Sequence, residues 1–296
     1  MTLAVRATRA ALVVLSAVAP PVAGELGYRL WRSLGRPEPV HPRDAAVHAR
    51  AERGILDLDG IPVATYTWGS GPEVVLLVHG WRSRASRFAA LVDDLESPGR
   101  TLVAFDAPGN GDTPGDRTSI LDYARIVRLL AARHGGVTAI VAHSFGVLCS
   151  FIAVREGVAV DRIVGLAGIH DADEIVRQFA REAGLGTRAK RGLRTRIERR
   201  FFAGIPDLWR RFTAELDPAD TRTSVLLVHD VGDPRVGFAQ SERIRDAHTG
   251  PVRLVATEGL GHNRLLGDPG VVATVAEFLD GPRVPDRTYR AEAPAA

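Results

Sequence analysis

The stretch VTAIVAHSFGVLCSFIAVREG, residues 137–157, contains the change of pattern that decides the fold. Its first part, up to His143, is a mostly apolar run, which is typical of a strand in a sheet covered on both faces. The longer apolar segment after Ser144 we interpret as a helix. Ser144 therefore lies at a strand-to-helix junction with small neighbours, Ala142 and Gly146. A serine there suits both a nucleophile on a sharp turn and a helix N-cap, and these few residues leave both interpretations open.

Strands and helices alternate on both sides of this junction. A hairpin is predicted at residues 55–69, and the apolar run EVVLLVHG follows as a strand at residues 73–80. Further strands are predicted at 101–109, 160–168, 223–230 and 251–257, and further helices at 119–135, 238–248 and 269–281. Alternation of apolar strands with amphipathic helices indicates parallel βαβ units. The predicted fold class is therefore α/β, with a mostly parallel doubly wound sheet and helices on both faces.

This alternation stops between about residues 170 and 221. The segment is rich in arginine, has a helical character and shows no strand pattern, so we interpret it as a helical cap inserted over the sheet. The α/β domain is predicted to span residues 51–282 around this cap insertion. Residues 1–50 are predicted to form an N-terminal helical, apolar extension with a linker, and residues 283–296 a tail.

Composition excludes several classes of protein. The chain has 296 residues, of which 45% are hydrophobic and 25% charged, as in a globular protein with a sizeable core. Its formal net charge of +3 does not indicate nucleic-acid binding. A single cysteine, Cys149, excludes an internal disulfide and favours a reducing compartment, so a cytoplasmic location is expected. No residue spacing predicts a zinc site, and the glycines at 109, 111 and 115 match no nucleotide-binding pattern, so no metal or cofactor is expected.

The N-terminal segment carries Arg6 and Arg9 and then an uncharged stretch from Ala10 to Gly24. This stretch is shorter than the roughly 20 apolar residues of a membrane-spanning helix, and two prolines interrupt it. Three interpretations stay open: a helix packed on the protein, association of residues 1–35 with a membrane surface, and an export signal. The lack of a convincing cleavage site counts against export.

Polar residues end several predicted strands, which is where ligands bind in open parallel sheets. A serine hydroxyl is a poor nucleophile until a base removes its proton, and a carboxylate must hold that base in the right tautomer. Downstream of Ser144, one strand ends in Asp230 and is followed by Asp233, and His262 lies in a glycine-bounded loop after the next strand. The chain order Ser, Asp, His is the one that this topology requires.

Five motifs in this order resemble those of the α/β-hydrolase fold family. They are VHGW at 78–81, FDAPGNGDTPG at 105–115, AHSFG at 142–146, HDVGDPRV at 229–236 and GLGHN at 259–263. Each motif is weak alone, but together they cover about residues 55–280 with suitable spacing. The sequence departs from the family pattern at Ala142, where the usual turn begins with glycine, and at Asn110, where relatives often have histidine or an aromatic residue.

The resemblance implies a catalytic triad and an oxyanion hole. Ser144 would be the nucleophile, His262 the general base and acid, and Asp233 the carboxylate that orients the histidine. The backbone N–H groups of Trp81 and Phe145 would form the oxyanion hole.

Three carboxylates compete for the position of the acid. Asp233 is favoured because His229, Asp233 and Val236 fit the pattern His-x-x-x-Asp-x-x-Val. Asp230, closer to the strand end, and Asp171, after the sixth strand, stay open as alternatives. By the same resemblance, His79 and Asp106 are expected to brace the loops that follow their strands.

The cap insertion is expected to form most of the substrate pocket. Phe201, Phe202 and Trp209 are the candidates to line it, and His143, beside the nucleophile, is the candidate for its floor. Packing of the cap on the core is an equally good explanation of these aromatic residues. The arginine cluster from Arg188 to Arg200 we interpret as a solvated helix face rather than an anion site.

The residues and the resemblance together predict a serine hydrolase that cleaves a carboxylic ester or a related small acyl substrate through an acyl-enzyme on Ser144. The same triad would also serve an acyltransferase, a thioesterase or a haloperoxidase-like enzyme. A non-catalytic ligand-binding protein of this fold is a further alternative, which the presence of nucleophile, base and acid disfavours. The oligomeric state is not predicted.

Overall fold

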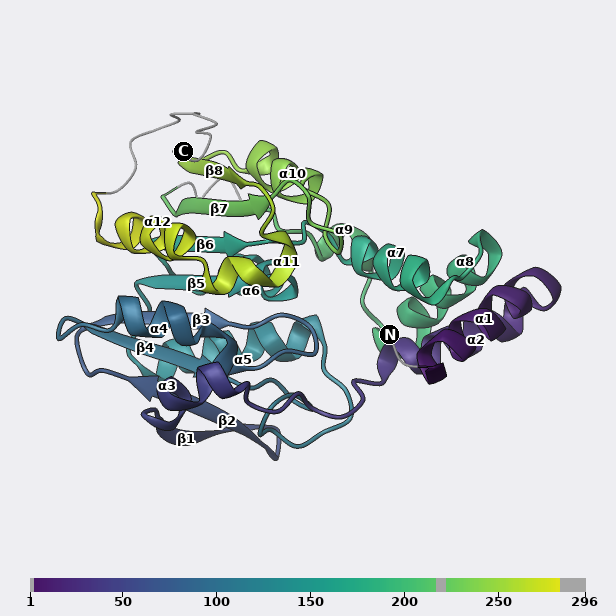
Figure 1. The fold of residues 1–296 in the computed structure, drawn as a ribbon, viewed down its shortest axis with the longest axis horizontal. Helices are drawn as coiled ribbons and strands as arrows, with labels where there is room; N and C mark the ends of the chain where they lie inside the picture. Colours follow the sequence, from purple (N-terminus) through teal and green to yellow (C-terminus); the bar gives the residue numbers. More distant parts are fainter. Residues whose placement is uncertain (1–2, 217–221, 283–296) are drawn as a thin grey trace. The chain divides into compact units, whose positions relative to one another are not determined.

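The chain forms two compact units in the computed structural model, which describes residues 3–216 and 222–282. We call them the helical unit, residues up to Gly35 together with Asp171–Thr213, and the sheet unit, Arg36–His170 together with the described residues from Ala214 onward. Their elements are labelled in Figure 1. The predicted tail at 283–296 and residues 217–221 of the predicted insertion lie outside the described residues.

An eight-stranded sheet forms the centre of the sheet unit, in the order β1-β2-β4-β3-β5-β6-β7-β8. The strands are β1 (Glu52–Leu58), β2 (Ile61–Trp68), β3 (Glu73–Val78), β4 (Arg100–Phe105), β5 (Ala139–His143), β6 (Arg162–Leu166), β7 (Ser224–Asp230) and β8 (Val252–Thr257). Strand β2 pairs antiparallel with β1 and β4, and all the other neighbours pair in parallel. The predicted mostly parallel α/β sheet is confirmed.

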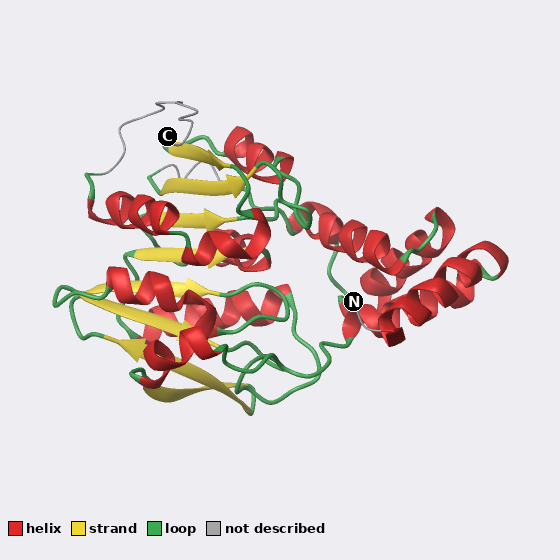
Figure 2. Cartoon of the chain, viewed as in Figure 1, coloured by secondary structure: helices red, strands yellow, loops and turns green. Residues whose placement is uncertain are grey.

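Helices cover both faces of this sheet (Figure 2). They are α3 (Ala45–Ala49), α4 (Ala89–Leu95), α5 (Ile120–Arg133), α6 (Phe145–Arg155), α10 (Ala239–Ala247), α11 (Gly261–Arg264) and α12 (Pro269–Asp280). Helices α4 and α12 pack together, as do α5 and α6. Val75 and Leu77 of β3 join the core beneath α4 and α12, while Leu76 between them is also fully buried. Side chains alternate across a strand, so a sheet covered on both faces needs a continuous apolar run.

The order of the strands reverses between β3 and β5. The chain leaves β3 towards β4 on one side, and strands β5 to β8 extend on the other. At such a reversal, the loops beyond the carboxyl ends of the two strands diverge and leave room for a ligand. The loop after β3 holds Gly80, where an added Cβ would lie 3.1 Å from Cβ of Ser144 at the end of β5. The topology therefore brings the predicted nucleophile beside the predicted oxyanion loop.

Residues 36–50 belong to the sheet unit, although the sequence prediction grouped them with the N-terminal extension. Here the short helix η1 (Pro42–Asp44) leads into α3, and Val47 is buried in the core. The carbonyl oxygen of Val47 accepts a hydrogen bond of 2.9 Å from Nε1 of Trp68. This anchoring to β2 explains why the boundary between the units falls near Gly35 rather than at residue 50.

Two N-terminal helices and the inserted segment together make the helical unit. Its elements are α1 (Leu3–Val18), α2 (Pro20–Arg32), α7 (Ala172–Ala183), α8 (Thr187–Arg196), η3 (Ile197–Phe201) and α9 (Leu208–Arg211). Helix α2 packs along α8, and α1 packs on α2 and α7. Gly24 of α2 permits this approach, because a Cβ there would lie 3.1 Å from the carbonyl oxygen of Ala189. None of the helices in the described part of the chain has the length and apolarity that a membrane span requires.

Candidate active site

A sharp turn between β5 and α6 carries Ser144. The residue has φ +55° and ψ −120°, a conformation that strains any residue with a side chain. Gly146 is required two residues later, because a Cβ there would lie 2.4 Å from the carbonyl oxygen of Val78. Ala142, the departure from the family pattern, has Val78 on β3 and Gly165 on β6 as its register partners, so on one side its methyl group lies beside a residue without a side chain. The turn therefore accommodates alanine at this position.

Ser144 points at His262, which lies on the short helix α11 after β8. The Nε2 atom of His262 is 3.0 Å from Oγ of Ser144. On the other side of the ring, Nδ1 of His262 lies 2.7 Å from Oδ2 of Asp233. A neutral imidazole that donates from Nδ1 presents its Nε2 lone pair to the serine hydroxyl. The structure thus brings together the three predicted triad residues in one series of hydrogen bonds, all within the sheet unit.

The carboxylate of Asp233 is held from several sides in the loop after β7. Its Oδ1 accepts hydrogen bonds from the backbone N–H groups of Arg235 at 2.8 Å and Val236 at 3.0 Å. Nε2 of His229 lies 3.5 Å from Oδ2 and donates to the carbonyl oxygen of Val236 at 2.9 Å. The three residues of the predicted pattern therefore form one local network. The sequence indicated His229 only as part of a pattern and gave it no role.

These contacts determine the charge state of Asp233. Burial raises the pKa of the carboxyl group, but the hydrogen bonds from His229 and His262, with a further one from the Arg235 backbone, outweigh burial and hold the pKa below its ordinary range. Asp233 is therefore ionised at neutral pH, as required of a carboxylate that accepts a hydrogen bond from Nδ1–H of His262.

The two alternative carboxylates bind elsewhere. Oδ2 of Asp230 accepts hydrogen bonds from the backbone N–H of Leu260 at 2.8 Å and the hydroxyl of Thr257 at 3.1 Å, so it ties β7 to the loop after β8. Asp171 is the N-cap of α7, where its Oδ1 accepts from the backbone N–H of Glu174 at 2.8 Å. Both have structural partners, and only Asp233 of the three contacts the ring of His262 among the contacts described.

His143, immediately before Ser144, contacts the histidine loop, and its place in a pocket floor stays a prediction. Its Nε2 donates to the carbonyl oxygen of His262 at 3.0 Å, and the two rings lie 4.9 Å apart between centroids. Its Nδ1 is buried and has no hydrogen-bond partner among the described residues. Burial, together with the neighbouring His262, lowers the pKa of His143 to about 3. His143 is therefore a neutral ring that supports the backbone of His262.

The predicted oxyanion donors, Trp81 and Phe145, lie on the loop after β3 and at the first position of α6. N–H groups in the first turn of a helix have no partner within the helix and can bind an anion. The two aromatic rings pack edge-on with centroids 5.2 Å apart. His79 braces the loop: its Nδ1 donates to the carbonyl oxygen of Gly80 at 2.7 Å, and its Nε2 accepts from the backbone N–H of Ala107 at 3.0 Å.

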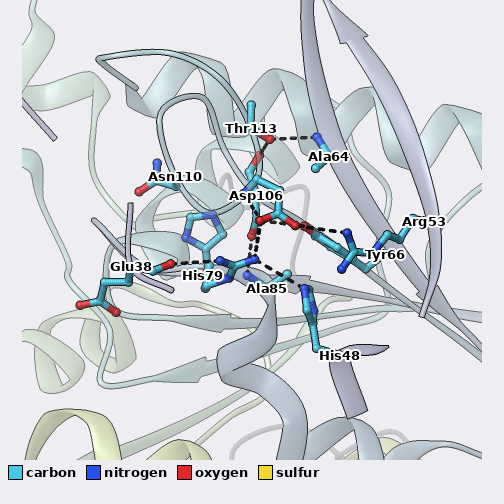
Figure 3. Close-up of polar contacts among 12 residues, drawn as sticks. Glu38, His48, Arg53, Ala64, Tyr66, His79, Ala85, Asp106, Asn110 and Thr113 are labelled. Atoms are coloured by element: carbon cyan, nitrogen blue, oxygen red, sulfur yellow. Dashed lines mark hydrogen bonds and ion pairs between the residues drawn. The ribbon is translucent and has the colours of Figure 1, made fainter. Parts of the chain in front are cut away.

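Figure 3 shows the network around Asp106, the fully buried carboxylate that directly follows β4. Its Oδ1 accepts from the backbone N–H of Ala85 at 2.7 Å, and its Oδ2 accepts from the hydroxyl of Tyr66 at 2.9 Å and the backbone N–H of Asp112 at 2.8 Å. A guanidinium nitrogen of Arg84 lies 3.6 Å from Oδ2 of Asp106 and supplies the compensating positive charge. Asp106 therefore joins the loops after β3 and β4 and has no contact with the triad among the hydrogen bonds described.

The turn after Asp106 is closely packed. A Cβ at Gly111, which has φ +48°, would lie 1.9 Å from Oδ2 of Asp106. Asn110, the second departure from the family pattern, is buried and donates from Nδ2 to the carbonyl oxygens of Ala107 at 3.4 Å and Pro108 at 3.1 Å. Asn110 thus closes this turn.

The aromatic candidates for the pocket contact other residues of the helical unit. Phe201 packs edge-on against Trp31 of α2 at 5.1 Å and against Phe202 at 4.9 Å. The ring of Trp209 lies 4.2 Å beneath the guanidinium of Arg194. These contacts give all three rings a packing role within the helical unit, and their place in a substrate pocket stays a prediction.

Potential metal ligands do not cluster in the described part of the chain: no group of three or more His, Cys, Asp or Glu side chains could hold a metal ion. Cys149 is buried in α6, and burial raises the pKa of its thiol well above the ordinary value. The sulfur is therefore a poor nucleophile.

Solved structures with this fold include several enzymes. Alpha/beta hydrolase domain-containing protein 10 from mouse has a TM-score of 0.60 and 17% identity, covering 78% of this chain and 97% of that chain. Naproxen esterase from Bacillus subtilis has a TM-score of 0.58 and 13% identity, covering 80% of this chain and 95% of that chain. Epoxide hydrolase A from Mycobacterium thermoresistibile has a TM-score of 0.56 and 16% identity, covering 78% of this chain and 98% of that chain. At these identities the likeness shows the fold alone.

Sequence comparison shows the family. Among curated proteins, no sequence matches the chain significantly. The model of the alpha/beta hydrolase family matches residues 75–275, which include the turn at Ser144, the acid loop and the histidine loop. This match covers more than half of the chain, so the protein belongs to the alpha/beta hydrolase family.

Proposed function

We propose that the protein is a serine hydrolase that cleaves a carboxylic ester through an acyl-enzyme on Ser144. Membership of the alpha/beta hydrolase family supports a hydrolase. The observation that carries the proposal is the series in which Oγ of Ser144 lies 3.0 Å from His262, whose other ring nitrogen lies 2.7 Å from the buried Asp233. A serine hydroxyl hydrogen-bonded to a histidine base, with an ionised carboxylate orienting that base, is the arrangement that nucleophilic acyl transfer needs.

In the first half of the reaction, Nε2 of His262 takes the hydroxyl proton as Oγ of Ser144 attacks the ester carbonyl carbon. The C–O bond to the alcohol then breaks, and the proton on His262 passes to the leaving oxygen, which departs as the alcohol. Asp233 remains ionised and stabilises the imidazolium, as its lowered pKa requires. The serine is left as an acyl ester.

In the second half, His262 removes a proton from water, and the resulting hydroxide attacks the acyl carbon. The bond to Oγ breaks, the serine recovers its proton from His262 and the carboxylic acid leaves. In both halves, the backbone N–H groups of Trp81 and Phe145 stabilise the oxyanion, and loss of one such donor typically costs about 10²–10³-fold in rate.

The aromatic residues beneath the turn support an apolar acyl group. Trp81 is half-buried and packs edge-on against Phe145, which in turn packs edge-on against the buried ring of Tyr123 at 5.1 Å. Phe145 and Tyr123 are buried, so Trp81 is the ring of the three that can contact a substrate, and its apolar surface favours hydrocarbon over charged groups next to the attacked carbonyl.

Labelling with a fluorophosphonate, followed by mass mapping, tests the proposal. We expect the phosphonyl group on Ser144, no label in Ser144→Ala and a labelling rate at least about 10³-fold lower in His262→Ala. His134→Ala is the matched control, because His134 ends α5 and has no contact with the triad among the hydrogen bonds described. A folded wild-type protein that stays unlabelled at Ser144, or a His134→Ala variant as slow as His262→Ala, would contradict the proposal.

Product analysis separates hydrolysis from acyl transfer. A p-nitrophenyl ester is incubated with the enzyme in water and again with an added alcohol, and the acid and new ester are quantified. We expect the acid as the main product in both cases. An excess of the new ester would make the protein an acyltransferase that uses the same triad.

A further inference from the structure

Helix α1 turns an apolar face towards solvent. Its exposed residues include eight apolar ones: Val5, Ala7, Ala10, Ala11, Val13, Val14, Ala17 and Val18. Ala7, Ala11, Val14 and Val18 recur at intervals of four, three and four, so they share one side of the helix. Val14 is 60% exposed and Val18 is 74% exposed. A helix on the surface of a soluble protein normally has charged and polar residues in these positions.

Helix α2 continues this pattern. Val22, which is 49% exposed, and Leu26, which is 37% exposed, lie four residues apart and form a stripe along the helix. Seven of the ten large hydrophobic side chains exposed in the described residues lie on α1 and α2. We call the exposed apolar residues of these two helices the α1–α2 face.

Charge is divided unequally between the two units. The helical unit, counted over residues 1–35 and 171–213, has 15 basic and 7 acidic residues, a formal net charge of +8. The rest of the chain has 23 basic and 28 acidic residues, a formal net charge of −5. Three exposed arginines border the apolar residues, namely Arg6 on α1 and Arg29 and Arg32 on α2, whereas Nε of Arg9 donates to the carbonyl oxygen of Glu182 on α7. The modest net charge of the whole chain therefore conceals a strongly cationic unit.

We propose that the α1–α2 face docks on a bilayer of anionic phospholipids, with the two helices lying in the interface. The valine and leucine side chains would enter the acyl-chain boundary, and the flanking arginines would reach the phosphate groups. An apolar stripe bordered by cations is what an anionic lipid surface attracts, through buried apolar area and through charge. The inference goes beyond the proposed hydrolase activity and does not depend on it.

Charge also distinguishes a membrane from a second copy of the chain as the occupant of this face. A symmetric dimer through the α1–α2 face would place one unit of charge +8 against another. Like charges across an interface oppose association, whereas an anionic membrane complements them. The described residues therefore favour lipid over self-association.

Cosedimentation of the full chain with vesicles tests the proposal. We expect binding to phosphatidylcholine vesicles that contain about 30% phosphatidylserine, and at least about tenfold weaker binding to pure phosphatidylcholine vesicles. Raising the NaCl concentration should weaken the binding to anionic vesicles, because salt screens the arginines.

Charged substitutions then locate the surface. In Val14→Asp/Val18→Asp we expect the partition coefficient to fall at least about tenfold, since two exposed apolar side chains can no longer enter the bilayer. Ile55→Asp/Leu121→Asp is the matched control, because these two residues are 67% and 37% exposed in the sheet unit. Arg6→Glu should weaken binding to anionic vesicles, and Arg128→Glu on α5 should not. Circular dichroism verifies that each variant is folded.

Three results would overturn the proposal. The first is no binding to anionic vesicles. The second is an equal loss of vesicle binding in the Val14→Asp/Val18→Asp and Ile55→Asp/Leu121→Asp variants. The third is a dimer, detected by light scattering after size exclusion, that Val14→Asp/Val18→Asp converts to a monomer while vesicle binding is unchanged. That last result would identify the α1–α2 face as a contact between copies of the chain.

Discussion

Replacing Asp233 with asparagine keeps the shape of the side chain but changes one acceptor into a donor. Oδ1 of Asp233 accepts the backbone N–H groups of Arg235 at 2.8 Å and Val236 at 3.0 Å. In Asp233→Asn, only the amide oxygen can accept those two hydrogen bonds, so the amide is fixed in one orientation. Its NH₂ group then takes the place of Oδ2 and faces Nδ1 of His262, 2.7 Å away in the wild type.

The consequence reaches Ser144 through the tautomer of His262. Because Nδ1 must now accept a hydrogen bond, the ring proton moves to Nε2, which lies 3.0 Å from Oγ of Ser144. A protonated Nε2 cannot accept the serine proton. We expect kcat for an ester substrate to fall about 10⁴-fold, equivalent to about 5.5 kcal/mol of activation free energy, with KM little changed.

Steady-state hydrolysis of a p-nitrophenyl ester measures this effect, and Asp230→Asn is its control. Asp230 accepts a hydrogen bond from the backbone N–H of Leu260 at 2.8 Å and has no contact with the ring of His262 among those described. Asp230→Asn should therefore lower the free energy of unfolding while kcat changes little. Urea unfolding gives the stability of both variants. The reasoning is refuted if Asp233→Asn keeps more than about a tenth of wild-type kcat, or if Asp230→Asn loses as much kcat as Asp233→Asn.

Two further predictions concern stability. Gly111→Ala should lower the free energy of unfolding by about 3 kcal/mol or more in urea titrations, because the new methyl group would overlap Asp106. Gly135→Ala, at φ +72° with no atom within 4 Å, should cost only about 1 kcal/mol, and equal losses would contradict the clash. The second prediction is that His143, whose pKa is lowered in the folded protein to about 3, makes the free energy of unfolding fall at acid pH. Below its ordinary pKa of about 6.5 the unfolded chain binds a proton that the folded protein does not, so stability falls as pH decreases. Between pH 7 and pH 5 this effect should lower the free energy of unfolding by about 2 kcal/mol. In urea titrations at the two pH values, the drop in the free energy of unfolding should be smaller by this amount in His143→Asn than in the wild type. An unchanged acid sensitivity in the variant would show that His143 does not contribute.

Local sequence predicted the elements of the site because each element leaves a short-range pattern. The strand and helix around Ser144 follow from hydrophobic period, whereas the need for glycine at 146 comes from the close approach of α6 to the end of β3. The pattern His-x-x-x-Asp-x-x-Val favoured Asp233 over Asp230, but the short-range pattern left Asp230 open. The two residues are three positions apart, Asp230 at the end of β7 and Asp233 in the loop that follows, and the choice depends on how the loop after β8 returns to meet them.

Distant contacts decided the rest of the site's surroundings. The role of His229 was not predicted, because its hydrogen bonds to Val236 and Ser241 depend on the path of the chain after β7. His143 was expected to shape a pocket floor, and the structure shows it bonded to the backbone of His262, which is 119 residues away in sequence. Side-chain partners at such separations have no signature in a single sequence.

By itself, the sequence determined the α/β class, the order of strands and helices and the chain order of a serine, a carboxylate and a histidine. These features depend on hydrophobic period and turn chemistry, which act over a few residues. Tertiary structure alone decided that α1 and α2 pack with the segment inserted after β6, and that residues 36–50 belong to the sheet unit. Packing between segments more than 100 residues apart depends on the shapes of their surfaces, such as the close approach at Gly24, and surface shape exists only after the chain has folded.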